Sequence, residues 1–184
     1  LLFDTPYIDA QTGERRSDQM IFDAMLDLIE QARELIVLDM FLFNHFHGKE
    51  EEPTRDVTAE LTEALLAARA RDASLTIILI TDPINTVYGG VRAPHLEQLE
   101  QAGVEVVMTR LLSLRDSNPS YSGWWRLMGE RLGNDADSGW LPNALGEGKV
   151  TLRSYLALLN FKANHRKTLI VDDGAGALRA LNQT

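Results

Sequence analysis

Apolar positions alternate between two spacings along the first part of the chain. Residues 1–16 carry Pro6, Gly13 and mixed charges, and we expect them to be irregular. From Ser17 or Asp18, either of which would cap a helix, apolar residues recur every three or four positions. Residues 35–43 are then apolar at nearly every position, which is typical of a short strand buried on both faces.

Two more helix and strand pairs follow. The second predicted helix begins after Thr54 or Asp56 and leads to an apolar strand at residues 75–81. The third begins at Pro94, a residue that suits a first helical turn, and leads to a strand at residues 104–108. Because strands separated by helices usually run parallel, the sequence predicts an α/β fold. We expect α/β/α layers, with a mostly parallel sheet flanked by helices on both faces.

Residues 111–149 break this alternation. They are rich in Ser, Asn, Gly and Asp, and we expect an insertion that carries a short aromatic helix at residues 124–132. Residues 150–159 then predict a helix and residues 168–171 a fourth buried strand. With 184 residues, of which 45% are hydrophobic, the chain is long enough for a single domain with its own core.

Composition narrows the classes of function. The chain contains no cysteine, which excludes disulfide bonds and thiolate zinc sites. Its net charge of −9 disfavours non-specific binding of nucleic acid, because an acidic surface repels a phosphate backbone. Anionic lipid headgroups would be repelled in the same way, so charge alone does not choose between these partners.

The residues best suited to chemistry lie around the fourth predicted strand. His165, Lys167 and Asp172 stand in H-x-K-x4-D spacing. Side chains alternate along a strand, so we expect His165 and Lys167 to point into one cleft. A lysine neutralises the oxygens of a phosphodiester, and an imidazole attacks phosphorus or protonates the leaving oxygen. Asp172 would turn back to orient an imidazole, either that of His165 or that of another histidine.

Residues 161–173 resemble the H-x-K-D motif of the phospholipase D superfamily, and the preceding helices and strands resemble a first repeat of that family. The resemblance implies a phospholipase D-like fold and phosphodiester hydrolysis or phosphatidyl transfer on phospholipids through a phosphohistidine. It assigns phosphate binding to His165 and Lys167 and an orienting role to Asp172. It implies no metal and no other cofactor.

Two features depart from the family pattern. Beyond the aspartate the family continues with a pair of small residues and an asparagine, whereas this chain has Arg179 and Ala180 there, and Asn182 does not fit the spacing. A complete family site also requires two motifs, and this sequence has one. We therefore expect a fragment of a longer two-repeat protein, with the second catalytic half supplied by a C-terminal repeat or by a second chain.

Two other functions stay open: a homodimeric nuclease with one motif per chain, and a non-catalytic repeat that binds phosphate. The acidic charge and the aromatic residues Tyr121, Trp124 and Trp125 favour a phospholipid over nucleic acid. The same aromatic residues would suit contact with a membrane surface or packing over the site. The sequence leaves the cellular compartment open.

Weaker patterns occur elsewhere. His45 and His47, with the acidic residues 50–52, would bind a metal, although a solvated loop is the favoured interpretation. His95 is expected at the surface, and Asp82 is expected to be a turn residue before Pro83.

Overall fold

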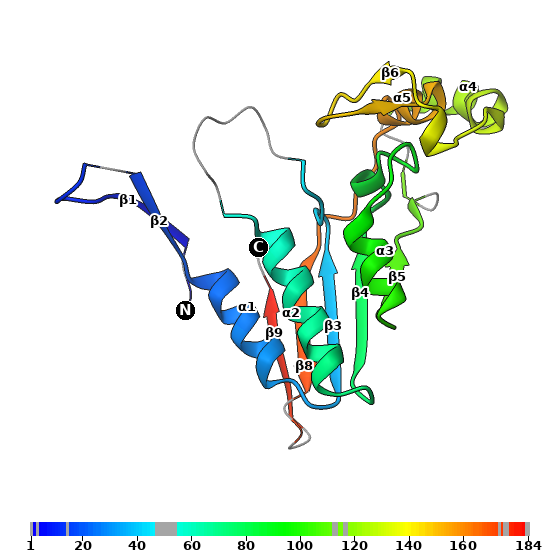
Figure 1. Cartoon of the computed structure of the whole chain (residues 1–184). Helices are drawn as coiled ribbons and strands as arrows, with labels where there is room; N and C mark the ends of the chain where they lie inside the picture. Colours follow the sequence, from blue (N-terminus) through cyan, green and yellow to red (C-terminus); the bar gives the residue numbers. More distant parts are fainter. Residues whose placement is uncertain are drawn as a thin grey trace.

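The centre of the molecule is a five-stranded sheet in the order β5-β4-β3-β8-β9 (Figure 1). The computed structural model describes residues 2, 4–13, 15–46, 55–111, 114–115, 118–172, 174 and 177–182. The strands are β3 (Leu35–Met40), β4 (Thr76–Thr81), β5 (Glu105–Met108), β8 (Lys167–Asp172) and β9 (Leu178–Asn182). Strands β3, β4 and β5 are parallel, whereas β8 runs antiparallel to both of its neighbours, β3 and β9.

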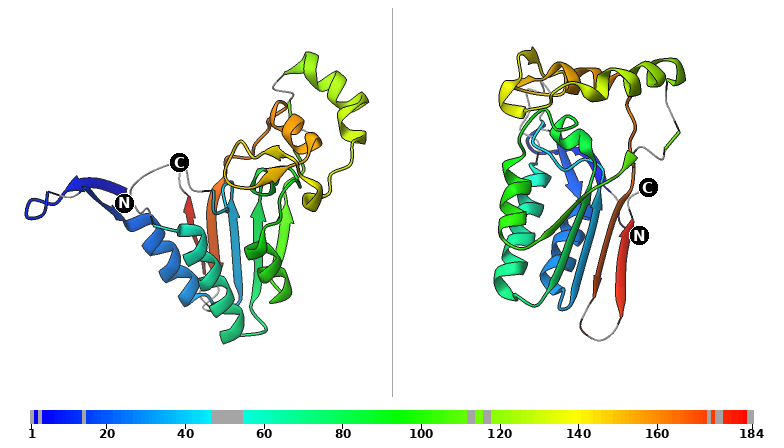
Figure 2. Two further views of the ribbon diagram at one scale, coloured as in Figure 1. Left: turned by 45° about the horizontal axis from the view of Figure 1, so that its top comes forward. Right: turned by 90° about the vertical axis from the view of Figure 1, so that its right-hand side faces the viewer.

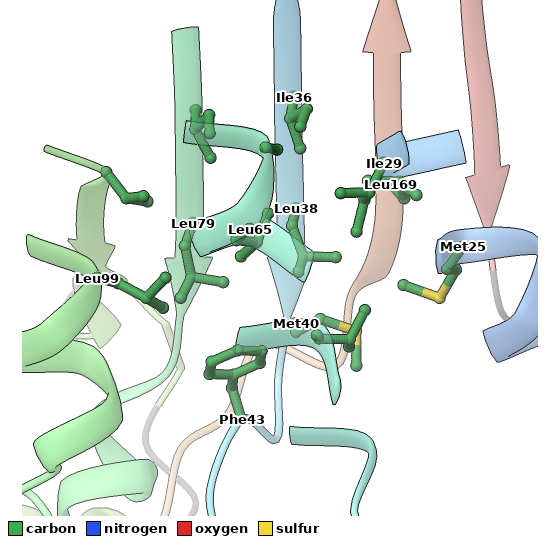
Figure 3. Close-up of a cluster of buried hydrophobic side chains, with 14 of the residues drawn as sticks. Met25, Ile29, Ile36, Leu38, Met40, Phe43, Leu65, Leu79, Leu99 and Leu169 are labelled. Atoms are coloured by element: carbon green, nitrogen blue, oxygen red, sulfur yellow. The ribbon is translucent and has the colours of Figure 1, made fainter. Parts of the chain in front are cut away.

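Three helices cover one face of this sheet, and all three lie on the same side in Figure 2. They are α1 (Met20–Gln31), α2 (Val57–Arg71) and α3 (Pro94–Gln101), and α2 contacts both of the others. Alternate strand side chains meet them in the buried core of Figure 3. Its members include Ile29, Leu65 and Leu99 from the helices and Ile36, Leu38, Leu79 and Leu169 from the strands.

The expected α/β class is present, but its layering differs from the prediction. No described helix lies on the second face of the sheet, so the expectation of helices on both faces is wrong for the part of the chain that the structure describes (Figure 2). The crossovers β3-α2-β4 and β4-α3-β5 advance in one direction, and right-handed crossovers that advance in one direction keep their helices on one face. The sheet is also mixed rather than mostly parallel, because β8 and β9 add two antiparallel pairings.

The helix termini follow the local sequence at α2 and α3. The Asp56 carboxylate caps α2 by accepting a hydrogen bond from the Ala59 amide at 2.9 Å. Pro94 occupies the first turn of α3, as expected. Gly103, just after that helix, has a φ of +87°, which a glycine adopts without strain.

The start of α1 is different, because the residues before it form a hairpin. Strand β1 (Asp4–Ile8) pairs with β2 (Arg15–Gln19) in a ribbon that projects from the sheet (Figure 1). The expected irregular lead-in and a cap at Ser17 or Asp18 are therefore wrong. Gln19 precedes the helix without a side-chain cap, and Asp4 of β1 accepts a hydrogen bond from the Ile21 amide at 3.1 Å instead.

A cap of short elements covers the carboxyl ends of the parallel strands (Figures 1 and 2). It contains α4 (Pro119–Leu127), β6 (Leu141–Pro142), β7 (Lys149–Val150), α5 (Leu152–Leu158) and the 3-10 helices η3 (Gly129–Arg131) and η4 (Ala136–Ser138). The cap includes most of the region expected as an insertion.

Asn134 ties this cap to the sheet. Its amide donates a hydrogen bond to the Tyr88 carbonyl at 2.8 Å, and its side-chain oxygen accepts from the hydroxyls of Thr151 and Ser154. Tyr88 follows the 3-10 helix η1 (Pro83–Thr86) at the end of β4. Among the described residues, no helix combines the length and the apolar composition needed to cross a membrane.

Candidate functional site

His165 lies in the irregular segment between α5 and β8, at the edge of the sheet where β3 ends. Its imidazole is exposed and stacks on the ring of Phe41, with the ring centroids 4.4 Å apart and the planes 26° from parallel. Phe41 is buried, and its amide donates to the Arg166 carbonyl at 3.1 Å. The imidazole is therefore presented to solvent on a fixed aromatic support.

Lys167 is the first residue of β8 and is half-buried. It pairs with Met40 of β3. Its side chain lines a cavity of about 260 Å³ together with Phe22 of α1 and Leu61 of α2, so it lies on the helix-covered face of the sheet. His165 is not among the residues that line this cavity.

His165 and Lys167 thus lie two positions apart at the same edge without sharing a described cavity. The alternation that predicted one common cleft applies within a strand, and β8 begins only at Lys167. The irregular backbone at His165 turns its ring toward Phe41 instead.

Asp172 lies at the far end of β8. The strand has six residues, which at a rise of about 3.3 Å per residue separates its ends by roughly 17 Å. The Asp172 carboxylate accepts from the Gly174 amide at 2.6 Å, and its carbonyl accepts from the Arg33 amide at 3.1 Å. The structure does not bring Asp172 to His165, so the expected orienting role is not met by this geometry.

Asp39 is a carboxylate near the His165 end that the sequence analysis did not select. It lies in the middle of the sheet opposite Thr168, and only 11% of its side chain is exposed. Its carboxylate is 3.5 Å from the guanidinium of Arg166. Burial raises the pKa of Asp39, and the positive charge of Arg166 opposes that rise. A charge inside an apolar strand was the available sequence signal.

Asp82 positions the segment that leads to His165. This residue is fully buried at the end of β4. Its carboxylate accepts hydrogen bonds from the amides of Ile84 and Asn164, each at 3.1 Å, and from the Thr109 hydroxyl at 3.4 Å. Asp82 is the turn residue that was predicted, and it also fixes the backbone one residue before His165.

Asn85 holds the chain that leaves β3. Its side-chain oxygen accepts from the Phe43 amide at 2.9 Å, and its side-chain nitrogen donates to the Phe41 carbonyl at 2.9 Å and to the Thr81 hydroxyl at 2.7 Å. The support under the His165 ring is therefore fixed by a buried amide from the neighbouring segment. The sequence gave no sign of this role, because Asn85 lies in a loop rich in turn residues.

A second histidine cluster lies beside this network. The rings of His45 and His95 meet edge to face at 4.7 Å, and His45 Nδ1 is 3.1 Å from the Asp56 carboxylate. His95 is buried, and its Nε2 is 2.9 Å from the Phe43 carbonyl, so the expectation of a surface histidine is wrong. Burial lowers the pKa of His95, and the bond to the Phe43 carbonyl acts in the opposite direction.

The metal alternative involves residues on both sides of a gap in the description. His47 and the acidic residues 50–52 lie outside the described residues. Among the residues that the structure describes, no group of three or more histidine, aspartate or glutamate side chains is placed to hold a metal ion. His45 instead lies against Asp56, the capping residue of α2.

The aromatic segment of the cap divides into a buried and an exposed part. Trp125 is buried, whereas Trp124, Leu127 and Met128 are each about half exposed on α4. The Tyr121 hydroxyl donates to the Leu156 carbonyl at 2.9 Å and joins α4 to α5.

A scan against protein-family models and a search of curated proteins found no match to this sequence. The proposal below therefore depends on the motif and on the geometry of its residues.

Proposed function

We propose that this chain supplies one half of a phosphodiesterase active site that acts on phospholipids. The observation that carries the proposal is the exposed His165 imidazole, stacked on buried Phe41, at the sheet edge where Lys167 begins β8. An accessible imidazole on a rigid support suits nucleophilic attack or proton transfer. Arg166 and Lys167 add positive charge beside it, which would stabilise a phosphoryl group in transfer.

In the proposed reaction, one imidazole forms a bond to phosphorus while the bond to the leaving oxygen breaks. A second imidazole, from the other half of the site, gives its proton to that oxygen. Water, or an alcohol in phosphatidyl transfer, then attacks phosphorus, the P–N bond breaks, and the second imidazole takes back a proton. His165 would perform one of these two roles. The other imidazole comes from a second repeat or a second chain.

Two features support a lipid rather than a nucleic acid as the substrate. The chain carries a net charge of −9, which opposes a long polyanion. The cap next to the sheet edge exposes Trp124, Leu127 and Met128, and such apolar side chains would meet acyl chains favourably.

The test is an assay of the purified chain on bis(p-nitrophenyl) phosphate over a wide range of protein concentration. We expect no turnover by the monomer, because one imidazole cannot stand on both sides of phosphorus. We also expect tungstate to shift the NMR signals of the His165 ring, and this binding to weaken as salt rises.

The other outcomes separate the alternatives. Activity that rises with the square of the concentration would indicate a homodimer with one motif per chain. Activity linear in concentration from a proven monomer would refute the half-site. A His165 ring that does not respond to tungstate would remove the support for phosphate chemistry at this residue.

A further inference from the structure

The largest described cavity lies under the cap, and its lining is basic. It has a volume of about 550 Å³ and is bounded by η1, the segment after β5, α4, α5 and the loop before β8. Four of its lining residues carry positive charge: Arg110, Arg126, Arg153 and Lys162. No aspartate or glutamate occurs among the described residues that line it.

This gathering of positive charge contrasts with the rest of the molecule. The chain has 27 acidic against 18 basic residues, yet four of the basic residues meet in one cavity. Cations held close together repel one another, and an anion bound among them relieves that repulsion. Guanidinium groups also offer paired donors that match the oxygens of a phosphate.

The remaining lining of the cavity is largely apolar. Trp125 and Ala157 are buried at its wall, and Leu111 contributes an aliphatic side chain. At about 550 Å³ the cavity is far larger than a single phosphate and falls within the range of pockets for small organic ligands, about 300–1,000 Å³. The ligand therefore needs an apolar body as well as an anionic group.

The cavity wall is also built with backbone strain. Val87 and Tyr88 have φ values of 47° and 54°, in the left-handed region that non-glycine residues seldom adopt. Tyr88 lines the cavity, and its hydroxyl donates to the Lys162 carbonyl at 3.2 Å. Burial raises the pKa of Tyr88 to about 12, so this donor stays protonated and fixes the Lys162 segment at neutral pH.

We propose that this cavity is a binding site for a phosphate ester carried on an apolar body, of the size of a short-chain anionic phospholipid. The phosphate lies among the four basic side chains, and the apolar part packs on Trp125 and Leu111. His165 does not line the cavity, so this is a second anion site, distinct from the one proposed at the motif.

The test is calorimetric titration of the full chain with four probes at concentrations where the lipids are monomeric. We expect dihexanoyl phosphatidylglycerol to bind at least about tenfold more tightly than dihexanoyl phosphatidylcholine, inorganic phosphate or adenosine monophosphate. Equal binding of phosphatidylcholine would overturn the anionic requirement. Equal binding of inorganic phosphate would overturn the apolar one, and tighter binding of the nucleotide would replace the lipid with a nucleotide.

Variants localise the binding. Arg153→Gln should weaken the phosphatidylglycerol complex roughly tenfold, the loss expected for one charge-assisted contact. Arg131→Gln, an exposed arginine of the same cap outside the cavity, is the matched control and should bind normally. Ala157→Leu narrows the cavity without changing its charge and should also weaken binding, with thermal unfolding followed to confirm the fold.

His165→Ala separates this inference from the proposed function. We expect it to bind phosphatidylglycerol as the parent chain does, whatever its effect at the motif. Loss of lipid binding in this variant, or unchanged binding in both Arg153→Gln and Ala157→Leu, would overturn the second site.

Discussion

The two ends of strand β8 are built in opposite ways. At its first end, His165 is exposed on Phe41, Arg166 is exposed beside it, and Lys167 lines a small cavity. At its other end, Asp172 is buried, and its carboxylate closes a turn on the Gly174 amide. One motif therefore spans the whole strand, with cations free to meet a ligand at one edge and an anchored carboxylate at the other.

This difference teaches how to interpret the motif spacing. The four residues between Lys167 and Asp172 measure a strand that crosses the sheet, rather than a loop that returns to a common site. Substitutions at the first end should therefore change activity with little effect on stability. Substitutions at the far end should do the reverse.

The largest effect is expected at His165. In the assembly that turns over, His165→Ala should lower kcat/KM for a phosphodiester by at least about 10³-fold, because no other group replaces an imidazole nucleophile or acid. The midpoint of thermal unfolding should hardly change, since the ring is exposed. His45→Asn, which alters an exposed ring outside the proposed site, is the control. Activity within tenfold of the parent would contradict the proposed role.

A smaller but still large effect is expected at Asp82, which holds the approach to His165 from a different strand. Asp82→Ala leaves the amides of Ile84 and Asn164 without their acceptor inside the protein and should cost roughly 3 kcal/mol of unfolding free energy. The protein that remains folded should also lose activity, because the segment before His165 is released. Asp135→Ala removes a similar cap from an exposed turn and should cost less in urea unfolding. Equal losses would mean that burial of Asp82 adds nothing.

At the other end of β8, the loss should be confined to stability. Asp172→Ala removes the acceptor of the Gly174 amide and should cost about 1–2 kcal/mol in urea unfolding, while kcat/KM of the folded protein stays within a few-fold. Asp72→Ala removes the same kind of turn bond at an exposed site and should cost less. A fall in kcat without a loss of stability would restore the orienting role that the sequence suggested for Asp172.

The sequence predicted the elements with strong apolar spacing and missed those without it. Helix α2 and strand β4 lie close to their expected positions, because burial on one face leaves a periodic pattern. The β1 and β2 hairpin was missed, since every described residue of β1 is exposed and no apolar alternation marks it. The single helical layer depends on strand order, which local patterns do not contain.

The same limit applies to the candidate site. His165 and Lys167 were found because their residue types and spacing are rare, whereas Asp39, Asn85 and His95 came from the fold alone. His95 follows a proline at the start of a helix, a position often at the surface. It is buried here because the Phe43 carbonyl, distant in sequence, lies 2.9 Å from its ring.

The smallest expected effect concerns Asp39, the buried carboxylate near the first end of β8. Because burial raises its pKa above 3.8, the folded state holds this proton more tightly than the unfolded state does. The stability that this proton contributes is present at low pH and is lost as pH rises from about 3.8 through the raised pKa. Asp39→Asn removes the charge and should therefore unfold at a slightly higher temperature than the parent at neutral pH.

The advantage of Asp39→Asn should shrink as the pH falls to 3.8 and below, where the parent carboxyl is protonated as well. Arg166→Gln should widen it at neutral pH, because the guanidinium is the charge that opposes the rise in pKa. Asp27→Asn, an exposed position on α1, should show neither trend. If Asp39→Asn is instead less stable than the parent at neutral pH, the ion pair with Arg166 outweighs the cost of burial. The first end of β8 would then need its charges for folding as well as for chemistry, and the contrast with the Asp172 end would narrow.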